Sequence, residues 1–358
     1  MNPNFMRKLF RAAIALVFPV VILCLLLLAY VDRYFDRALN LGETAQTFVL
    51  NRGTGFSAAI NQAASRGWLT QPDVLKIYGR LFPSQAEIRA GEYRLEPGTT
   101  VGEWLQMLRD GEVLSHQLTF VEGSTLGQVL QQLSSHALID AEGIKPPADE
   151  QFWSSLGIEQ PLAENPEGLF FPDTYDFHRG DSAQMLLRRA YQRLQRVLNE
   201  EWAARADDLP YKTAYEALIM ASIIEKETGV PHERGEIAGV FVRRLQRGMR
   251  LQTDPTVIYG MGEAYRGNIR GRDLRDASNP YNTYRINGLP PTPIALAGRE
   301  AIHAALHPVA GDSLFFVAKG DGSHQFSATL AEHEAAVRRY QLRRRSDYRS
   351  SPVATEKR

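Results

Sequence analysis

An uninterrupted apolar stretch near the N-terminus constrains this chain more than any other feature. From Ala12 to Val31 there is no charged residue, and Leu, Ile, Val and Phe dominate. About 20 such residues, each adding about 1.5 Å of helix, cross a bilayer core of about 30 Å. Pro19 lies inside the stretch, which membrane helices tolerate. Because the run lacks a small-residue cleavage site and is too apolar for a core helix, we interpret residues 12–31 as a transmembrane anchor.

Charges beside this stretch predict its orientation. The segment before it carries three basic residues, whereas acidic and basic residues balance just after it (Arg7, Lys8, Arg11; Asp32, Arg33, Asp36, Arg37). By the positive-inside rule, residues 1–11 lie in the cytoplasm and the chain after about residue 32 lies outside the cytoplasmic membrane. The single cysteine, Cys24, falls within the span, so the exported part has no thiol for disulfides, nucleophilic catalysis or metal binding. The formal net charge of zero gives no reason to expect a nucleic-acid partner.

An internal repeat follows the anchor. The segment 97–108 reappears in similar form at 122–133, and each copy comes after a short alternating run that predicts a strand. Each copy also contains a capping box, Thr100-x-x-Glu103 or Thr125-x-x-Gln128, that predicts the start of an amphipathic helix. The pattern fits a module that holds extended carbohydrate chains, but the periodicity alone favours a simple packing unit.

The remaining chain divides by composition. Residues 138–164 are loop-rich and acidic, which predicts a connector. Residues 165–345 alternate strand-like runs, turns and helices, so we expect an α+β domain there. The segment 346–358 is basic and polar and is predicted to be a disordered tail.

The segment 211–229 carries the strongest candidate for chemistry. It is rich in helix formers and ends at Gly229. On this helix Glu225 continues an apolar stripe that includes Leu218 and Ala221, and Ser222 lies one turn before it. Burial and the helix C-terminus both raise the pKa of a carboxyl group, as a general acid needs near neutral pH. The alternative is a structural ion pair with an arginine such as Arg243 or Arg244 on the following helix.

The neighbouring acidic residue, Glu227, is expected to lie on a different side of the helix. Glu227 is rotated far from Glu225 around the helix and is expected to be exposed together with Lys226.

Three polar segments, 167–175, 251–259 and 279–293, are candidates for binding sugars. Tyrosine faces suit the C–H faces of sugar rings, and amides and carboxylates suit their hydroxyls. These segments supply the predicted substrate-binding residues in addition to Ser222 (Gln252, Thr253, Asp254, Tyr281, Asn282, Tyr284 and Glu167).

Metal chemistry is not expected. His333 and Glu334 begin a pattern typical of zinc proteases, but Val337 replaces its second histidine. His303 and His307 have metal-binding spacing, but the sequence shows no third ligand beside them. We therefore predict no metal site and no organic cofactor.

Several long motifs together resemble one family. ASIIEKET at 221–228, LQTDPTVIYG at 251–260, PYNTY at 280–284 and NGLPPTPI at 287–294 are similar to motifs of the YceG-like endolytic murein transglycosylases. The resemblance covers residues 45–342, and EGLFFPDTY, from Glu167 to Tyr175, also fits. It implies that Glu225 is the acid/base and that residues 45–137 form a LysM-like glycan-binding module before the catalytic domain.

The resemblance also implies a reaction and a location. Glu225 protonates the oxygen between N-acetylmuramic acid and N-acetylglucosamine and then deprotonates the muramyl C6 hydroxyl, which gives a 1,6-anhydro end. The catalytic domain lies in the periplasm, and the expected partners are glycan strands, the inner membrane and the peptidoglycan synthesis machinery. Two alternatives remain: a non-catalytic wall-binding scaffold, and a hydrolytic muramidase in which Asp254 or Glu167 supplies a second carboxylate.

Overall fold

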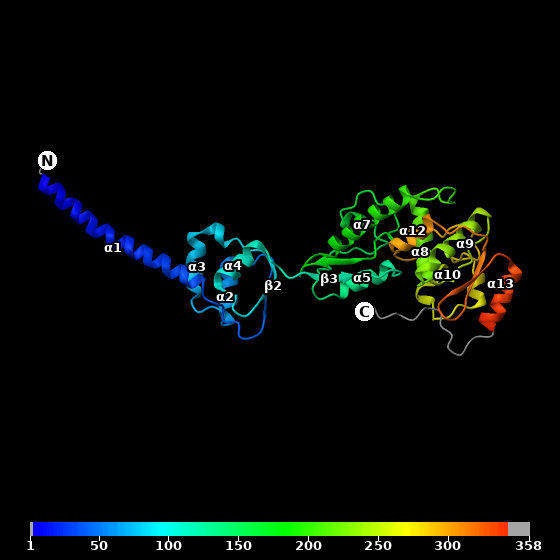
Figure 1. Ribbon diagram of the computed structural model, residues 1–358, viewed down its shortest axis with the longest axis horizontal. Coiled ribbons are helices and arrows are strands. Elements are labelled where there is room, and N and C mark those ends of the chain that lie inside the picture. The colour runs from blue at the N-terminus through cyan, green and yellow to red at the C-terminus, as the bar shows by residue number, and fades with distance from the viewer. Residues whose placement is uncertain (1–2, 343–358) are drawn as a thin grey trace. The chain divides into compact units, whose positions relative to one another are not determined.

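The computed structural model describes residues 3–342 and divides them into two compact units (Figure 1). Unit 1 comprises the residues up to 116 together with 178–180, and unit 2 comprises 117–177 and the residues from 181 onward. Both units contain helices and short paired strands, which confirms a mixed α+β fold. The basic tail predicted at 346–358 lies outside the described residues.

Unit 1 begins with the long helix α1 (Pro3–Phe35). Its segment Val17–Phe35 has a mean hydropathy of 2.0 and is long and apolar enough to cross a membrane, and the described residues contain no second helix of this kind. The end of the helix belongs to the globular part of unit 1, because Tyr34 is only 1% exposed and the ring of Phe35 packs edge-on against Tyr78. The apolar segment is therefore continuous with the unit that follows it.

The rest of unit 1 is a strand pair covered by short helices. Its elements are β1 (Gln46–Leu50), α2 (Phe56–Ser65), α3 (Pro72–Leu81), η1 (Pro83–Ala86), β2 (Gly91–Leu95) and α4 (Val101–Asp110). β1 and β2 are antiparallel, with Phe48 opposite Tyr93, and Phe48 also packs edge-on against Trp104 of α4. The predicted capping box of α4 is confirmed, since Thr100 and Glu103 bond to each other's backbone N–H groups.

Unit 2 has more helices. Its first elements are β3 (His116–Thr119), whose first residue belongs to unit 1, α5 (Leu126–Ser135), α6 (Phe152–Ser155), β4 (Thr174–Phe177) and α7 (Ala183–Ala203). The middle of the unit contains α8 (Ala214–Glu227), η2 (Pro231–Glu233), α9 (Arg234–Gln246), α10 (Asp254–Met261), η3 (Gly262–Ala264) and α11 (Gly271–Arg275). The last elements are α12 (Arg299–Leu306), the antiparallel pair β5 (Phe315–Ala318) and β6 (His324–Ser327), α13 (Leu330–Val337) and the π-helical turn η4 (Arg338–Leu342).

The second repeat copy lies in a different unit from the first. The predicted capping box of α5 is present at Thr125 and Gln128. However, Leu126 and Leu133 of α5 join the core that contains Phe170, and the two units divide at residue 117. The expected module 45–137 therefore spans both units. The expected connector 138–164 lies within unit 2, where Phe152 enters the core.

Helix α8 is the centre of unit 2. It packs against α7, α9, α10 and α12, and every residue from Ala217 to Ile224 is buried. A helix that is apolar around its whole circumference is a core helix, so the single apolar face expected from the sequence is too narrow a description. Polar groups at the end of α8 are consequently held among buried neighbours.

Candidate active site

Glu225 lies in the last turn of α8, where the buried part of the helix meets polar loops. Its side chain is 6% exposed. The backbone N–H of Gly298, which precedes α12, donates a hydrogen bond of 3.0 Å to Oε2 of Glu225. The predicted burial of this carboxyl group is thus found in the structure, and it has one direct hydrogen-bond donor.

The electrostatic surroundings raise the pKa of Glu225. Burial is the largest cause, and the negative charge of Glu122 acts in the same direction. The Gly298 N–H and the positive charges of Arg234 and Lys226 oppose the rise but do not cancel it. A carboxyl group with a raised pKa keeps its proton to a higher pH, which is the property required of a general acid.

The arginine nearest to Glu225 is not one that the sequence indicated. Arg243 donates to the carbonyl oxygens of Ser313 and Val309, and Arg244 donates to backbone carbonyls and to Gln252, so neither of the two arginines named in the ion-pair alternative is the partner of Glu225. Their backbone acceptors lie in loops that sequence spacing does not bring near α9. Arg234 approaches Glu225 instead, but at 3.6 Å from Oε1 it is beyond ordinary hydrogen-bond length.

The loop before α5 brings a second carboxylate to Gly298. Lys226 donates to the carbonyl of Gly123 at 3.0 Å, and the backbone of 123–124 exchanges two 2.8 Å hydrogen bonds with Leu296. A methyl group on Gly298 would meet Oε1 of Glu122 at 2.0 Å, so the carboxylate of Glu122 occupies the space that glycine leaves. Glu122 and Glu225 therefore both contact Gly298.

Sequence reasoning missed Glu122. It was treated as part of the repeat, and about a hundred residues separate it from Glu225. An exposed glutamate in a turn gives no signal of this proximity, because the contact depends on how α5, α8 and α12 converge.

Ser222 supports the site from within the core. Ser222 is fully buried. Its hydroxyl donates a hydrogen bond to the carbonyl of Ile219 and accepts one from the N–H of Ile294 at 3.0 Å. It thus holds the segment 294–298 against α8 and has no exposed surface for a substrate.

Several other predicted binding residues gather in a separate cavity of about 370 Å³. The carboxylate of Asp254 accepts a 2.7 Å hydrogen bond from the Tyr284 hydroxyl, and Gln252 and Thr253 also line the cavity. Gln252 has a φ of 54°, a left-handed conformation that a residue other than glycine rarely adopts. Gln252, Thr253 and Asp254 are consecutive in the sequence, and they lie together in this cavity with Tyr284. Glu225 is not among the residues that line it.

Glu227 faces this cavity, which contradicts the expectation that it is exposed. Its carboxyl group accepts a hydrogen bond from the Thr253 hydroxyl. Burial raises the pKa of Glu227 to about 7; the Thr253 hydrogen bond lowers it and the charge of Asp254 raises it further. The expectation failed because the loop 251–254 folds over this side of α8.

The aromatic loop is held by its own side chains. Asn282 is fully buried, and its amide donates to the carbonyl oxygens of Asp273, Leu274 and Asp276. The Tyr281 hydroxyl lies 2.9 Å from the Thr292 hydroxyl. These two predicted binding residues are positioned to shape the loop 279–292.

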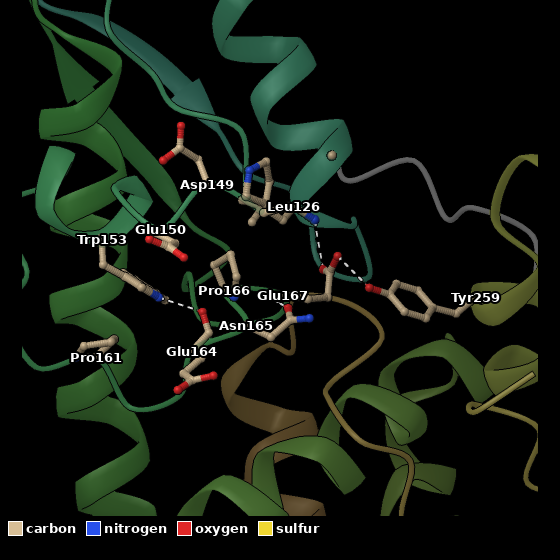
Figure 2. Close-up of a pocket in the computed structure, with 13 residues that line it drawn as sticks. Leu126, Asp149, Glu150, Trp153, Pro161, Glu164, Asn165, Pro166, Glu167 and Tyr259 are labelled. Atoms are coloured by element: carbon tan, nitrogen blue, oxygen red, sulfur yellow. Dashed lines mark hydrogen bonds between the residues drawn. The ribbon is translucent and has the colours of Figure 1, made fainter.

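Glu167 lies beside a larger cavity of about 700 Å³ (Figure 2). Its carboxylate accepts hydrogen bonds from the N–H of Leu126 at 2.9 Å and from the Tyr259 hydroxyl at 3.1 Å, and burial raises its pKa. Trp153 and Tyr259 line the cavity with aromatic surface. Leu126 lines this cavity, and Glu122, four residues earlier in the chain, lies at the Glu225 site. The short segment 122–126 therefore connects the two places.

Comparisons with known proteins match most of the chain. A model of the YceG-like family matches residues 48–339. The endolytic murein transglycosylase of Bacillus subtilis (strain 168) is 32% identical over 272 residues, which cover 72% of this chain and 75% of that protein. The protein of the same name from Streptococcus pneumoniae serotype 2 (strain D39) is 26% identical over 285 residues, and the match spans about half of its length, 51%. A crystal structure of a YceG-like protein from Listeria monocytogenes has 27% identity and a TM-score of 0.53, with coverage of 82% of this chain and 99% of that one.

Proposed function

This chain belongs to the YceG-like family, and from that premise we propose that it is an endolytic murein transglycosylase with Glu225 as its acid/base. The observation that carries the proposal is a carboxyl group that is 6% exposed and has a raised pKa at the end of a core helix. Its substrate is the peptidoglycan glycan strand, as the names of its relatives indicate.

The mechanism that we propose uses one carboxyl group twice. Protonated Glu225 gives its proton to the oxygen that joins N-acetylmuramic acid to N-acetylglucosamine, and the bond from that oxygen to muramyl C1 breaks. The Glu225 carboxylate then takes the proton from the muramyl C6 hydroxyl while the oxygen of that hydroxyl attacks C1. The product has a 1,6-anhydro end. The N–H of Gly298 stabilises the carboxylate formed between the two steps. No metal or organic cofactor takes part in this scheme.

A hydrolytic muramidase remains the second candidate because a second carboxylate is present. Glycosidases that use water need two carboxyl groups on either side of the scissile bond. Asp254 and Glu167, the candidates from the sequence, are engaged by Tyr284 and by Leu126 and Tyr259 in the two cavities. Glu122 is the carboxylate that contacts Gly298 together with Glu225, so it takes their place in this alternative.

Product analysis separates these candidates. The purified full-length chain in detergent is incubated with uncross-linked murein strands, and the new ends are identified by mass spectrometry. We expect anhydro-muramyl ends from the wild type, none from Glu225→Gln, and unchanged turnover from Glu334→Gln, which alters a surface glutamate loosely paired with Arg338. Reducing ends that vanish in Glu122→Gln would support the muramidase. No new ends from either the wild type or Glu225→Gln would leave only a wall-binding role, and equal new ends from both would refute Glu225 as the acid/base.

The location and the binding module are part of the same proposal. The apolar segment of α1 supports a single-pass anchor, with residues 1–11 in the cytoplasm and the catalytic unit in the periplasm near the synthesis machinery. The LysM-like role of residues 45–137 rests on the two strand–turn–helix copies, one in each unit. Binding of a fragment that contains both copies, residues 45–137, to insoluble murein in a pull-down, with the full chain as reference, tests the module.

A further inference from the structure

A cluster of metal-binding side chains lies outside the site described above. Glu201 lies near the end of α7, and His303 and His307 lie at the end of α12. One ligand atom from each of the three lies within 4.8 Å of the others. Among the described residues, no second group of three such side chains is found. The sequence shows no third ligand beside these histidines, so the prediction of no metal site rested on its absence; the fold supplies one, Glu201, from about a hundred residues away.

The geometry of the cluster is already ordered. The two imidazole rings stack with centroids 4.3 Å apart and an interplanar angle of 28°. Oε2 of Glu201 lies 2.9 Å from Nδ1 of His303, and its Oε1 accepts a 2.7 Å hydrogen bond from Arg299. Glu201 itself is buried, whereas His303 is largely exposed, so the cluster is held firmly on one side and open to solvent on the other.

The donor set indicates which ions it suits. Imidazole nitrogen is a ligand for zinc, copper and nickel, whereas magnesium and calcium prefer sites made of oxygen atoms only. Two histidines and one carboxylate form a common three-ligand set for Zn²⁺, with water in the fourth position. The C-terminus of α12 adds partial negative charge, which favours a cation there. The Arg299 contact resembles the outer hydrogen bonds that orient ligating carboxylates.

We propose that Glu201, His303 and His307 form a binding site for Zn²⁺ or a similar divalent transition-metal ion. The ion takes one oxygen from Glu201 and one nitrogen from each histidine, and it joins the end of α7 to the end of α12. Since Gly298 is the residue that immediately precedes α12, the ion stabilises the helix next to the N–H that bonds to Glu225. The site is separate from the reaction, and neither proposal depends on the other.

The test measures Zn²⁺ binding directly. The full-length chain is purified in detergent with a tag that contains no histidine, stripped with chelator, and titrated with Zn²⁺ by calorimetry. We expect one ion per chain, an affinity at least tenfold lower in His307→Gln, and no change in His232→Gln, which alters an exposed histidine elsewhere in unit 2. Co²⁺ should give visible absorption bands in the wild type that His307→Gln loses.

Stability and activity controls make the outcome interpretable. Zn²⁺ should raise the melting temperature of the wild type and of His232→Gln but not that of His307→Gln, and the metal-free melting temperatures of all three should agree. The absence of saturable binding, or equal binding by wild type and His307→Gln, would overturn the proposal. Murein cleavage by the metal-free wild type is measured separately, so a failed metal site leaves the proposed enzymatic function intact.

Discussion

Replacing Glu225 with glutamine separates a general acid from a structural ion pair. Glutamine has nearly the same size, and its side-chain oxygen can still accept the hydrogen bond from Gly298. It cannot, however, donate a proton to a leaving oxygen as a carboxylic acid does. Proton transfer by a positioned side chain contributes about 10²- to 10⁴-fold to rate. We therefore expect turnover to fall by about that factor, equivalent to about 2.7–5.4 kcal/mol of transition-state stabilisation.

The same substitution has a predictable effect on stability. Because the folded protein raises the pKa of Glu225 above its ordinary value of 4.5, the folded state holds that proton more tightly than the unfolded state. Any stability gained in this way is fully present below pH 4.5 and is lost as pH rises through the folded pKa. The glutamine variant titrates nowhere in this range. It should therefore match the wild type at acidic pH and be at least as stable at pH 7 to 8.

A structural ion pair between Glu225 and Arg234 predicts the opposite. Removing one partner of a buried ion pair costs about 3–5 kcal/mol. In a unit of this size each kcal/mol lowers the melting temperature by roughly 2–4 °C. The two side chains lie within ion-pair distance, at 3.6 Å, but the effect of burial on the pKa of Glu225 outweighs the charge of Arg234, as a general acid requires.

Two measurements on the same preparations decide the matter. Denaturant unfolding at acidic and neutral pH gives the free energies, and quantification of anhydro-muramyl ends gives the rates, with Glu334→Gln as control. Our reasoning is refuted if Glu225→Gln unfolds several kcal/mol more easily at neutral pH, or if it cuts murein at the wild-type rate.

Three further predictions concern other parts of the chain. Glu122→Gln removes a negative charge that raises the pKa of Glu225, so the alkaline limb of the pH–rate profile should move to lower pH; an unmoved limb would place Glu122 outside the site. Because burial raises the pKa of Glu227 to about 7, wild-type unfolding free energy should fall between pH 4.5 and about 7, and in Glu227→Gln this slope should be smaller in denaturant titrations; an unchanged slope would refute the raised pKa. Deleting residues 1–31 should move the chain from the membrane fraction to the soluble fraction, since the cut leaves the buried Tyr34 in unit 1. A truncated chain that stays with membranes would show a second attachment.

Local signals in the sequence predicted local structure well. The capping boxes at Thr100 and Thr125 are present because both partners of each box lie within four residues. The apolar stretch forms part of one helix, as its composition requires. The end of α8 is at Glu227, close to the predicted stop at Gly229, and Glu225 is buried there as its position on the helix indicated.

Long-range contacts could not be predicted in the same way. The fold brings together Glu122 and Gly298, Thr253 and Glu227, and Glu201 and His303 from distant parts of the sequence. A helix buried on all sides has no solvent-facing side, so rotation around α8 did not predict that Glu227 would be covered. The division between units at residue 117 likewise depends on where the apolar residues of α5 pack.

Gly298 connects these long-range contacts to the chemistry. Its N–H bonds to Glu225, and its missing side chain leaves room for Glu122. The segment that carries it is fixed on one side by Ser222 through Ile294 and on the other by the first turn of α12. Burial in a water-poor setting raises the pKa of Glu225, whereas the Gly298 N–H opposes that rise and stabilises the carboxylate once the proton has gone to the substrate. Burial therefore prepares Glu225 to act as an acid, and the position of one backbone N–H prepares its carboxylate to act as the base that follows.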